Sequence, residues 1–132
     1  MKNGNPVVAI VENDAAMLKA LERLLRASGY ASVLFPSAEL YLARAAGAAV
    51  ACMILDIDLG GISGIELQQR LVERGNPPPI IFVTSQIDSV LQERAKALGC
   101  LAYLRKPFAS HELLQALRAV QQLQAAPPSG AG

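Results

Sequence analysis

The chain of 132 residues is long enough for one domain with a single well-buried core. Its hydrophobic content is 52% and its aromatic content only 5%, so Leu, Ile, Val and Ala must fill most of that core. The 12 Lys and Arg residues nearly balance the 11 Asp and Glu residues, and the resulting net charge of +1, without a basic patch, argues against direct binding of nucleic acid.

Cysteine usage and the N-terminal segment indicate where the protein works. Cys52 and Cys100 lie in apolar segments without a closely spaced partner, which favours free thiols in a reducing compartment over a disulfide or a metal site. The N-terminal segment is too short and too polar for a signal peptide, and no apolar run approaches the length of a membrane span. We therefore expect a cytoplasmic protein that does not bind membranes.

Five short apolar segments alternate with five segments of helical periodicity. The apolar segments, which we expect to be strands, cover residues 7–11, 32–35, 51–55, 80–84 and 101–104. The helical segments cover residues 15–29, 37–47, 63–75, 89–99 and 110–124. Strands separated by helices run parallel, and strands that are apolar throughout are typical of a sheet covered on both faces. The pattern predicts an α/β fold with a doubly wound, five-stranded parallel sheet and five helices.

Residue types at the helix ends support these boundaries. Asp14 is the expected N-cap of the first helix, Ser63 and Glu66 have the spacing of a capping box, and Ser110 is the expected N-cap of the last helix. The first four helical segments end on glycine, at Gly29, Gly47, Gly75 and Gly99. We predict one domain over residues 5–125 and a flexible tail or linker over residues 126–132.

Polar residues gather where the predicted strands end. The carboxyl ends of parallel strands meet at one edge of a sheet, which is where open α/β sheets bind ligands. Four strands bring polar side chains to this edge: Glu12, Asn13, Asp14, Asp56, Thr84 and Lys106. Carboxylates can hold Mg²⁺, a lysine can neutralise phosphoryl oxygens, and a carboxylate can form an acyl phosphate. These residue types therefore suit phosphoryl transfer to a carboxylate, with Asp56 as acceptor because it follows the central strand.

Four ordered motifs carry a resemblance to a known family. They are VEND (11–14), ILDIDLGGISGIEL (54–67), VTS (83–85) and KPF (106–108). Together they resemble response-regulator receiver domains, of the chemotaxis-regulator (CheY-like) fold, over about residues 5–125. The segment PSAELYLARA (36–45) is similar to receivers of transcription regulators of the nitrogen-fixation type. The resemblance implies a flavodoxin-like sheet with the strand order 2-1-3-4-5.

The resemblance also implies a function and the residues that perform it. A sensor histidine kinase would phosphorylate Asp56 in the presence of Mg²⁺, and the chain would be a phosphoacceptor rather than an enzyme. Thr84 and Lys106 would respond to the phosphoryl group, and Tyr103 would join Thr84 in the conformational switch. The Lys106–Pro107 bond is typically cis in the family, which would direct the ammonium group into the site.

The output would pass through the face formed by the fourth helix, the fifth strand and the fifth helix. This face would control an output domain or a downstream protein, and it could also form a homodimer. No output domain is expected within the 132 residues, so the chain either docks to partners or is the receiver part of a longer regulator.

The metal site departs from the family pattern. Its expected ligands are Glu12, Asn13, Asp56 and the backbone carbonyl of Asp58, but receivers usually carry a second acid where this chain has Asn13. We therefore expect weaker binding of Mg²⁺. Asp58 and Gln86 are expected to tune the lifetime of the acyl phosphate, although the Asp58 side chain could equally be a solvated loop residue.

Three further interpretations complete the predictions. Gly60 and Gly61 replace the usual proline and acid after the acceptor, so this loop should be more mobile than in most relatives. Tyr103 could simply be a packing aromatic, and His111 is expected at the surface. Two alternatives for the whole chain stay open: a phosphate-independent pseudo-receiver with a weakened metal site, and a phosphatase of the haloacid-dehalogenase type, suggested by the DIDLG motif.

Overall fold

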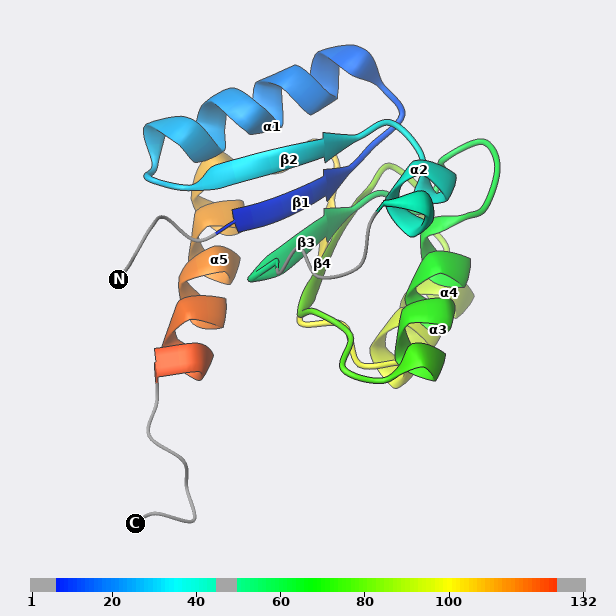
Figure 1. Cartoon of the computed structure of the whole chain (residues 1–132). Coiled ribbons are helices and arrows are strands. Elements are labelled where there is room, and N and C mark those ends of the chain that lie inside the picture. Colours follow the sequence, from blue (N-terminus) through cyan, green and yellow to red (C-terminus); the bar gives the residue numbers. More distant parts are fainter. Residues whose placement is uncertain (1–6, 45–49, 126–132) are drawn as a thin grey trace, which may run out of the picture.

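A computed structural model describes residues 7–44 and 50–125 (Figure 1). Five strands form one parallel sheet in the order β2-β1-β3-β4-β5. The elements in chain order are β1 (Val7–Val11), α1 (Ala15–Ala27), β2 (Ala31–Phe35), α2 (Ala38–Ala43), β3 (Cys52–Leu55), α3 (Gly64–Arg74), β4 (Ile80–Thr84), α4 (Ser89–Ala97), β5 (Ala102–Arg105) and α5 (Ser110–Ala125). This arrangement confirms the predicted α/β fold and its strand order.

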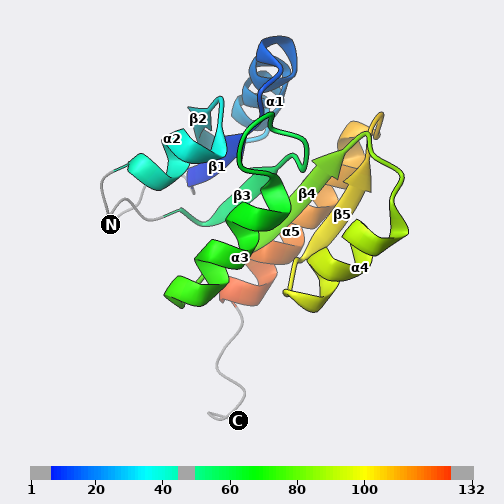
Figure 2. The same cartoon turned by 90° about the vertical axis from the view of Figure 1, so that its right-hand side faces the viewer.

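Helices lie on both faces of the sheet (Figure 2), and each face packs against its own apolar cluster. Helices α1 and α5 cover one face, where Leu21, Leu25 and Leu117 pack in one buried cluster. Helices α2, α3 and α4 cover the other face and contribute to a second cluster. Successive residues of β1 alternate between them: Ile10 belongs to the first cluster and Val11 to the second. The uniformly apolar strands are thus explained by burial on both faces.

Most predicted helix ends agree with the structure, and two differ. The Asp14 side chain caps α1 by accepting hydrogen bonds from two backbone N–H groups, and Ser63 caps α3 through the N–H of Glu66. Helix α2 ends at Ala43 rather than at Gly47, which lies outside the described residues.

The second difference concerns the start of α5. Ser110 is the first residue of this helix rather than its N-cap. The carboxylate of Glu112 instead accepts a hydrogen bond from the N–H of Ala109, at 2.8 Å, and so satisfies a backbone group that precedes the helix.

Three predictions concern the cysteine thiols, membrane-spanning segments and the limits of the domain. Cys52 and Cys100 are both free, and burial raises the pKa of the Cys52 thiol to about 12, so this thiol is unreactive at neutral pH. None of the helices within residues 7–44 and 50–125 has the length and apolar character of a membrane span. The domain limits at residues 5 and 125 stay predictions, and the proposed tail at 126–132 lies outside the described residues.

Candidate functional site

The carboxyl ends of four strands bring polar side chains together, as the sequence predicted. Glu12 follows β1, Asp56 follows β3, Thr84 ends β4 and Lys106 follows β5. Glu12 and Thr84 are 1% and 0% exposed, and Asp56 is also buried. Because buried polar side chains are costly unless they are paired, their contacts indicate what this edge of the sheet is built to hold.

The Lys106 ammonium group lies between two buried carboxylates. Its Nζ atom is 2.7 Å from Glu12 Oε1 and 3.3 Å from Asp56 Oδ2. The backbone fixes this residue as well, because the Lys106 N–H donates to the Thr84 carbonyl at 2.8 Å. The Lys106–Pro107 peptide bond is cis, as the family resemblance implied.

The proton affinities of Asp56 and Lys106 reflect this arrangement. Burial, together with the negative charge of Glu12, raises the pKa of Asp56, and Lys106 only partly opposes this effect. Burial alone would lower the pKa of Lys106, but the hydrogen bond to Glu12 and the charges of both carboxylates raise it overall. The site thus concentrates negative charge that one ammonium group does not fully neutralise.

Glu12 is held from both sides. Its N–H donates to the carbonyl of Phe35 at 3.0 Å, and its Oε2 accepts from the N–H of Asp14 at 3.0 Å. The Asp14 side chain is itself occupied as the N-cap of α1. Asp14 therefore positions Glu12 through its backbone, and its carboxylate serves the helix.

Thr84 and Tyr103 lie on the face of the sheet that α4 covers. Phe82 and Tyr103 are register partners in β4 and β5, their rings lie 6.0 Å apart, and both pack in the cluster of that face. Thr84, two residues after Phe82, faces the same way. Its Oγ1 accepts from the N–H of Gln86 at 3.1 Å, whereas the buried Tyr103 hydroxyl has no hydrogen-bond partner among the described residues. Their predicted switch role stays a prediction.

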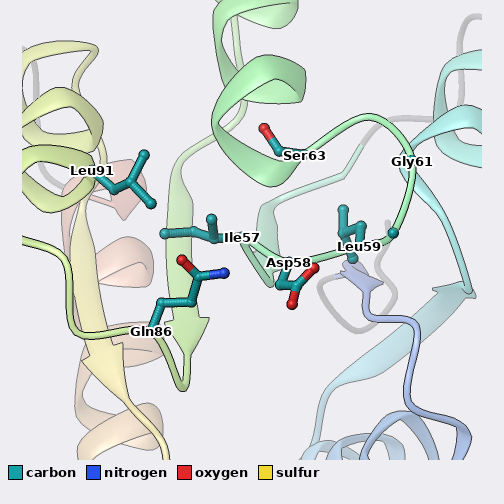
Figure 3. A pocket seen from close by; sticks show the side chains of 8 residues that line it. Ile57, Asp58, Leu59, Gly61, Ser63, Gln86 and Leu91 are labelled. Atoms are coloured by element: carbon teal, nitrogen blue, oxygen red, sulfur yellow. The ribbon is translucent and has the colours of Figure 1, made fainter.

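A cavity of about 230 Å³ opens beside the loop that follows Asp56 (Figure 3). Gln86 reaches into it from the end of β4, and Asp58 reaches into it from the loop after β3. The Asp58 side chain is exposed, and its N–H lies 3.4 Å from Asp56 Oδ1. Both residues thus line this cavity, and their effect on acyl-phosphate lifetime stays a prediction.

The oxygen donors fit a magnesium ion. Glu12 and Asp56 already share one cation, the Lys106 ammonium, so both carboxylates reach a common point. Within residues 7–44 and 50–125 no group of three or more His, Cys, Asp or Glu side chains could hold a metal. Asn13 is exposed and offers an amide oxygen at most. Two carboxylates completed by carbonyl groups and water suit Mg²⁺, which keeps several waters in protein sites.

Two hydrogen bonds between segments that are distant in the sequence were not predicted. The Glu39 carboxylate of α2 accepts from the N–H of Ile62, and Gln68 of α3 donates to the carbonyl of Ala95 in α4 at 3.0 Å. Gln68 could have been noticed, because it lies three residues from Ile65 and Leu71 on the apolar face of its helix. No local sequence pattern indicated the contact of Glu39, because its partner Ile62 is 23 residues away.

The sequence matches the family described as "Response regulator receiver domain" over residues 8–118. The chain belongs to this family. The "Response regulator protein TodT" of Pseudomonas putida is 35% identical over 123 residues, which cover 93% of this chain and 54% of that protein. The "Transcriptional regulatory protein FixJ" of Bradyrhizobium diazoefficiens is 32% identical, covering 94% and 61%. A response regulator receiver protein from Burkholderia phymatum superposes with a TM-score of 0.77 at 37% identity, covering 94% and 99%.

Membership in the receiver family decides several expectations. The receiver is a phosphoacceptor module of two-component systems rather than a catalytic enzyme, so the phosphatase alternative is wrong. Receivers partner with histidine kinases and typically bind Mg²⁺. The chain spans about half the length of the curated relatives it matches. His111 is exposed, as predicted.

We expect Asp56→Asn to raise the free energy of unfolding of the receiver by about 1 kcal/mol at pH 7 in the presence of a chelator. The substitution removes a buried carboxylate that Glu12 repels and keeps the ion pair between Lys106 and Glu12. Folding raises the pKa of Asp56 above 3.8. Below that value the carboxyl group is neutral in both the folded and the unfolded states, so its charge does not destabilise the fold. The destabilisation develops as the pH rises through the folded-state pKa. The stabilisation should therefore shrink on acidification.

Urea unfolding followed by circular dichroism, at neutral and at acid pH, measures this difference. Asp88→Asn is the matched control, since Asp88 is an exposed N-cap of α4 and Asn caps helices equally well. A less stable Asp56→Asn variant at pH 7 would show that the carboxylate is a net stabiliser.

Proposed function

We propose that this receiver accepts a phosphoryl group on Asp56 from a sensor histidine kinase and changes the output face formed by α4, β5 and α5. The observation that carries the proposal is the pairing of Lys106 with both buried carboxylates, Glu12 and Asp56, at the carboxyl edge of the sheet. Charged groups with perturbed pKa values cluster at functional sites, and phosphoryl transfer to a carboxylate uses this combination of an acidic pair and a cation.

The transfer step follows from these positions. An oxygen of the Asp56 carboxylate attacks the phosphorus atom of a phosphohistidine, a P–O bond forms, and the P–N bond breaks with its electron pair returning to the imidazole. The Lys106 ammonium, which now contacts Asp56, is close enough to neutralise charge on the transferred group. Glu12, Asp56, the Asp58 carbonyl and the Asn13 amide oxygen would hold Mg²⁺, which supplies further charge neutralisation when bound.

Thr84 and Tyr103 are suited to respond to the new group. The Thr84 hydroxyl uses its oxygen to accept from Gln86, so its proton is available for a phosphoryl oxygen. The Tyr103 hydroxyl has no partner to lose among the described residues if the ring moves. Phosphorylation would bias an equilibrium between arrangements of this face. Ile87 and Val90, 76% and 74% exposed, give it apolar contacts for an output domain, a downstream protein or a second copy.

The pseudo-receiver is the second candidate, and Asn13 is the residue that favours it. An amide in place of a carboxylate removes one negative charge beside the proposed cation. Glu12, Asp56, Thr84 and Lys106 nevertheless keep the chemistry that phosphorylation needs. We therefore propose weakened binding of Mg²⁺ rather than loss of phosphorylation.

Intact mass after incubation with a small phosphodonor tests the proposal. We expect one phosphoryl adduct that requires Mg²⁺, persists in Asp58→Asn and is absent from Asp56→Asn. At limiting Mg²⁺, Asn13→Asp should form the adduct faster, because a second carboxylate raises the affinity for the metal. A folded wild-type protein that forms no adduct at any Mg²⁺ concentration would favour the pseudo-receiver.

A further inference from the structure

The loop between β3 and α3 lies against the acceptor site and contains two glycines. Ile57 and Leu59 anchor it in the core, and Asp58 between them is exposed. Gly60 has φ +85°, a left-handed conformation that glycine adopts without strain. A side chain from another part of the sequence contacts the backbone of the next two residues, Gly61 and Ile62.

Glu39 of α2 makes that contact. Its Oε2 accepts a hydrogen bond from the N–H of Ile62 at 3.0 Å. A Cβ atom added to Gly61 would overlap the same oxygen and lie 3.2 Å from Glu39 Cδ, so the carboxylate rests directly on the Gly61 backbone. The hydrogen bond lowers the pKa of Glu39, as expected for a carboxylate that accepts from a backbone N–H.

The position of Glu39 is itself well defined. Ser37 caps α2 by accepting from the N–H of Leu40, and Ala38 and Tyr41 are buried on either side of Glu39. On the opposite side of the loop, a Cβ atom on Gly60 would lie 3.8 Å from Asn13 Nδ2. The loop therefore lies between α2 and the segment after β1, which carries Glu12 and Asn13.

We propose that Glu39 is a positioning residue of the acceptor site, which holds the β3–α3 loop so that Asp58 and Asp56 keep their relative geometry. The inference rests on the proposed phosphorylation of Asp56. The loop N–H of Asp58 lies 3.4 Å from Asp56 Oδ1, and the Asp58 backbone carbonyl is a proposed ligand of Mg²⁺, so a displacement of the loop alters the site directly. Gly61 is required because any side chain there would displace the carboxylate.

Two different substitutions break this one contact. Glu39→Ala removes the acceptor, and Gly61→Ala pushes the flexible carboxylate aside without a φ conflict. Each should lower the rate of phosphorylation by a small donor about three- to tenfold at limiting Mg²⁺, and the double variant should fall no further than either single one. Glu39→Gln, which keeps an acceptor oxygen, should recover most of the rate. Glu73→Ala, an exposed acid of α3 outside the loop, is the matched control.

The amide resonance of Ile62 provides a readout that does not depend on phosphorylation. In Glu39→Ala and Gly61→Ala the Ile62 amide should shift and exchange faster with solvent, while amides of the β1 and β4 core stay protected. Wild-type rates in Glu39→Ala, or losses that multiply in the double variant, would overturn the proposal. If the wild type accepts no phosphoryl group, the proposed function fails, and an unchanged Ile62 amide would separately show that Glu39 does not hold the loop.

Discussion

Lys106→Met is expected to lower the free energy of unfolding by about 2 to 4 kcal/mol at pH 7, because it leaves two carboxylates buried without their shared cation. Glu12 is 1% exposed and the Lys106 side chain 16% exposed, so solvent can replace little of the lost interaction. Methionine fills most of the space of the lysine stem, which keeps the loss of packing small. The effect should therefore report the charge.

The pH dependence of this loss separates charge from packing. Asp56 has a raised pKa in the folded protein. Below its ordinary value of 3.8 the carboxyl group is neutral in both the folded and the unfolded states, so Lys106→Met lowers the free energy of unfolding least there. The cost grows as the pH rises through the folded-state pKa. On the alkaline side, the raised pKa of Lys106 means that its stabilising charge is fully present below 10.5 and is lost as the pH rises through its folded-state pKa.

Chemical unfolding of the wild type and the variant across this pH range is the measurement. Lys96→Met is the matched control, since Lys96 is exposed on α4, and it should change stability by less than about 0.5 kcal/mol. A loss for Lys106→Met that is the same at acid and neutral pH would contradict the electrostatic explanation. The variant should also accept phosphate more slowly, since the charge that neutralises the phosphoryl oxygens is gone.

Gly64→Ala is expected to destabilise the receiver by about 2 to 4 kcal/mol and to displace Asp56. A Cβ atom at Gly64 would overlap the carbonyl oxygen of Asp56 and lie 2.9 Å from both the Asp56 carbonyl carbon and Ile57 Cα. These are backbone atoms, which cannot rotate away as a side chain would. The N–H of Gly64 also donates to the Ile57 carbonyl at 2.8 Å, so the two segments cannot separate without losing that bond.

Gly29→Ala distinguishes this clash from the general cost of replacing glycine. Gly29 follows α1 with φ +91° and no atom within 4 Å of an added Cβ, and the N–H of Tyr30 donates to the Leu25 carbonyl across this turn. This is the usual left-handed end of a helix, so the substitution should cost only about 1 kcal/mol of backbone strain. Thermal unfolding compares the two variants, and phosphorylation of the folded fraction reports on Asp56. A Gly64→Ala variant as stable as Gly29→Ala would show that α3 can move away from Asp56.

Local patterns in the sequence predicted much of this molecule. The alternation of apolar and helical segments gave the parallel sheet, because a strand–helix–strand connection leaves few other topologies. Asp14 and Ser63 were identified as caps, since a capping side chain acts within three residues of its own position. The same locality explains why four polar residues were expected at one edge, because each is the last residue of a strand or the residue directly after it: Glu12, Asp56, Thr84 and Lys106.

Contacts between residues that are distant in the sequence could not be predicted from such local patterns. Nothing near Glu39 in the sequence indicates that it bonds Ile62, and nothing near Gly64 indicates that α3 rests on the Asp56 backbone. At Gly64 local propensity predicts the opposite sign from the steric overlap, because alanine is a better helix former than glycine by about 1 kcal/mol. Helix α2 likewise ends before the glycine that seemed to close it.

The sequence by itself therefore determined the order of the elements, the fold class and the residue types that meet at the carboxyl edge of the sheet. Only the tertiary structure decided that Lys106 pairs with both Glu12 and Asp56 and that Glu39 contacts the β3–α3 loop at Ile62. The physical reason is range. Propensity and capping act over a few neighbouring residues, whereas an ion pair or a steric overlap depends on distances of a few ångströms between segments that only folding brings together.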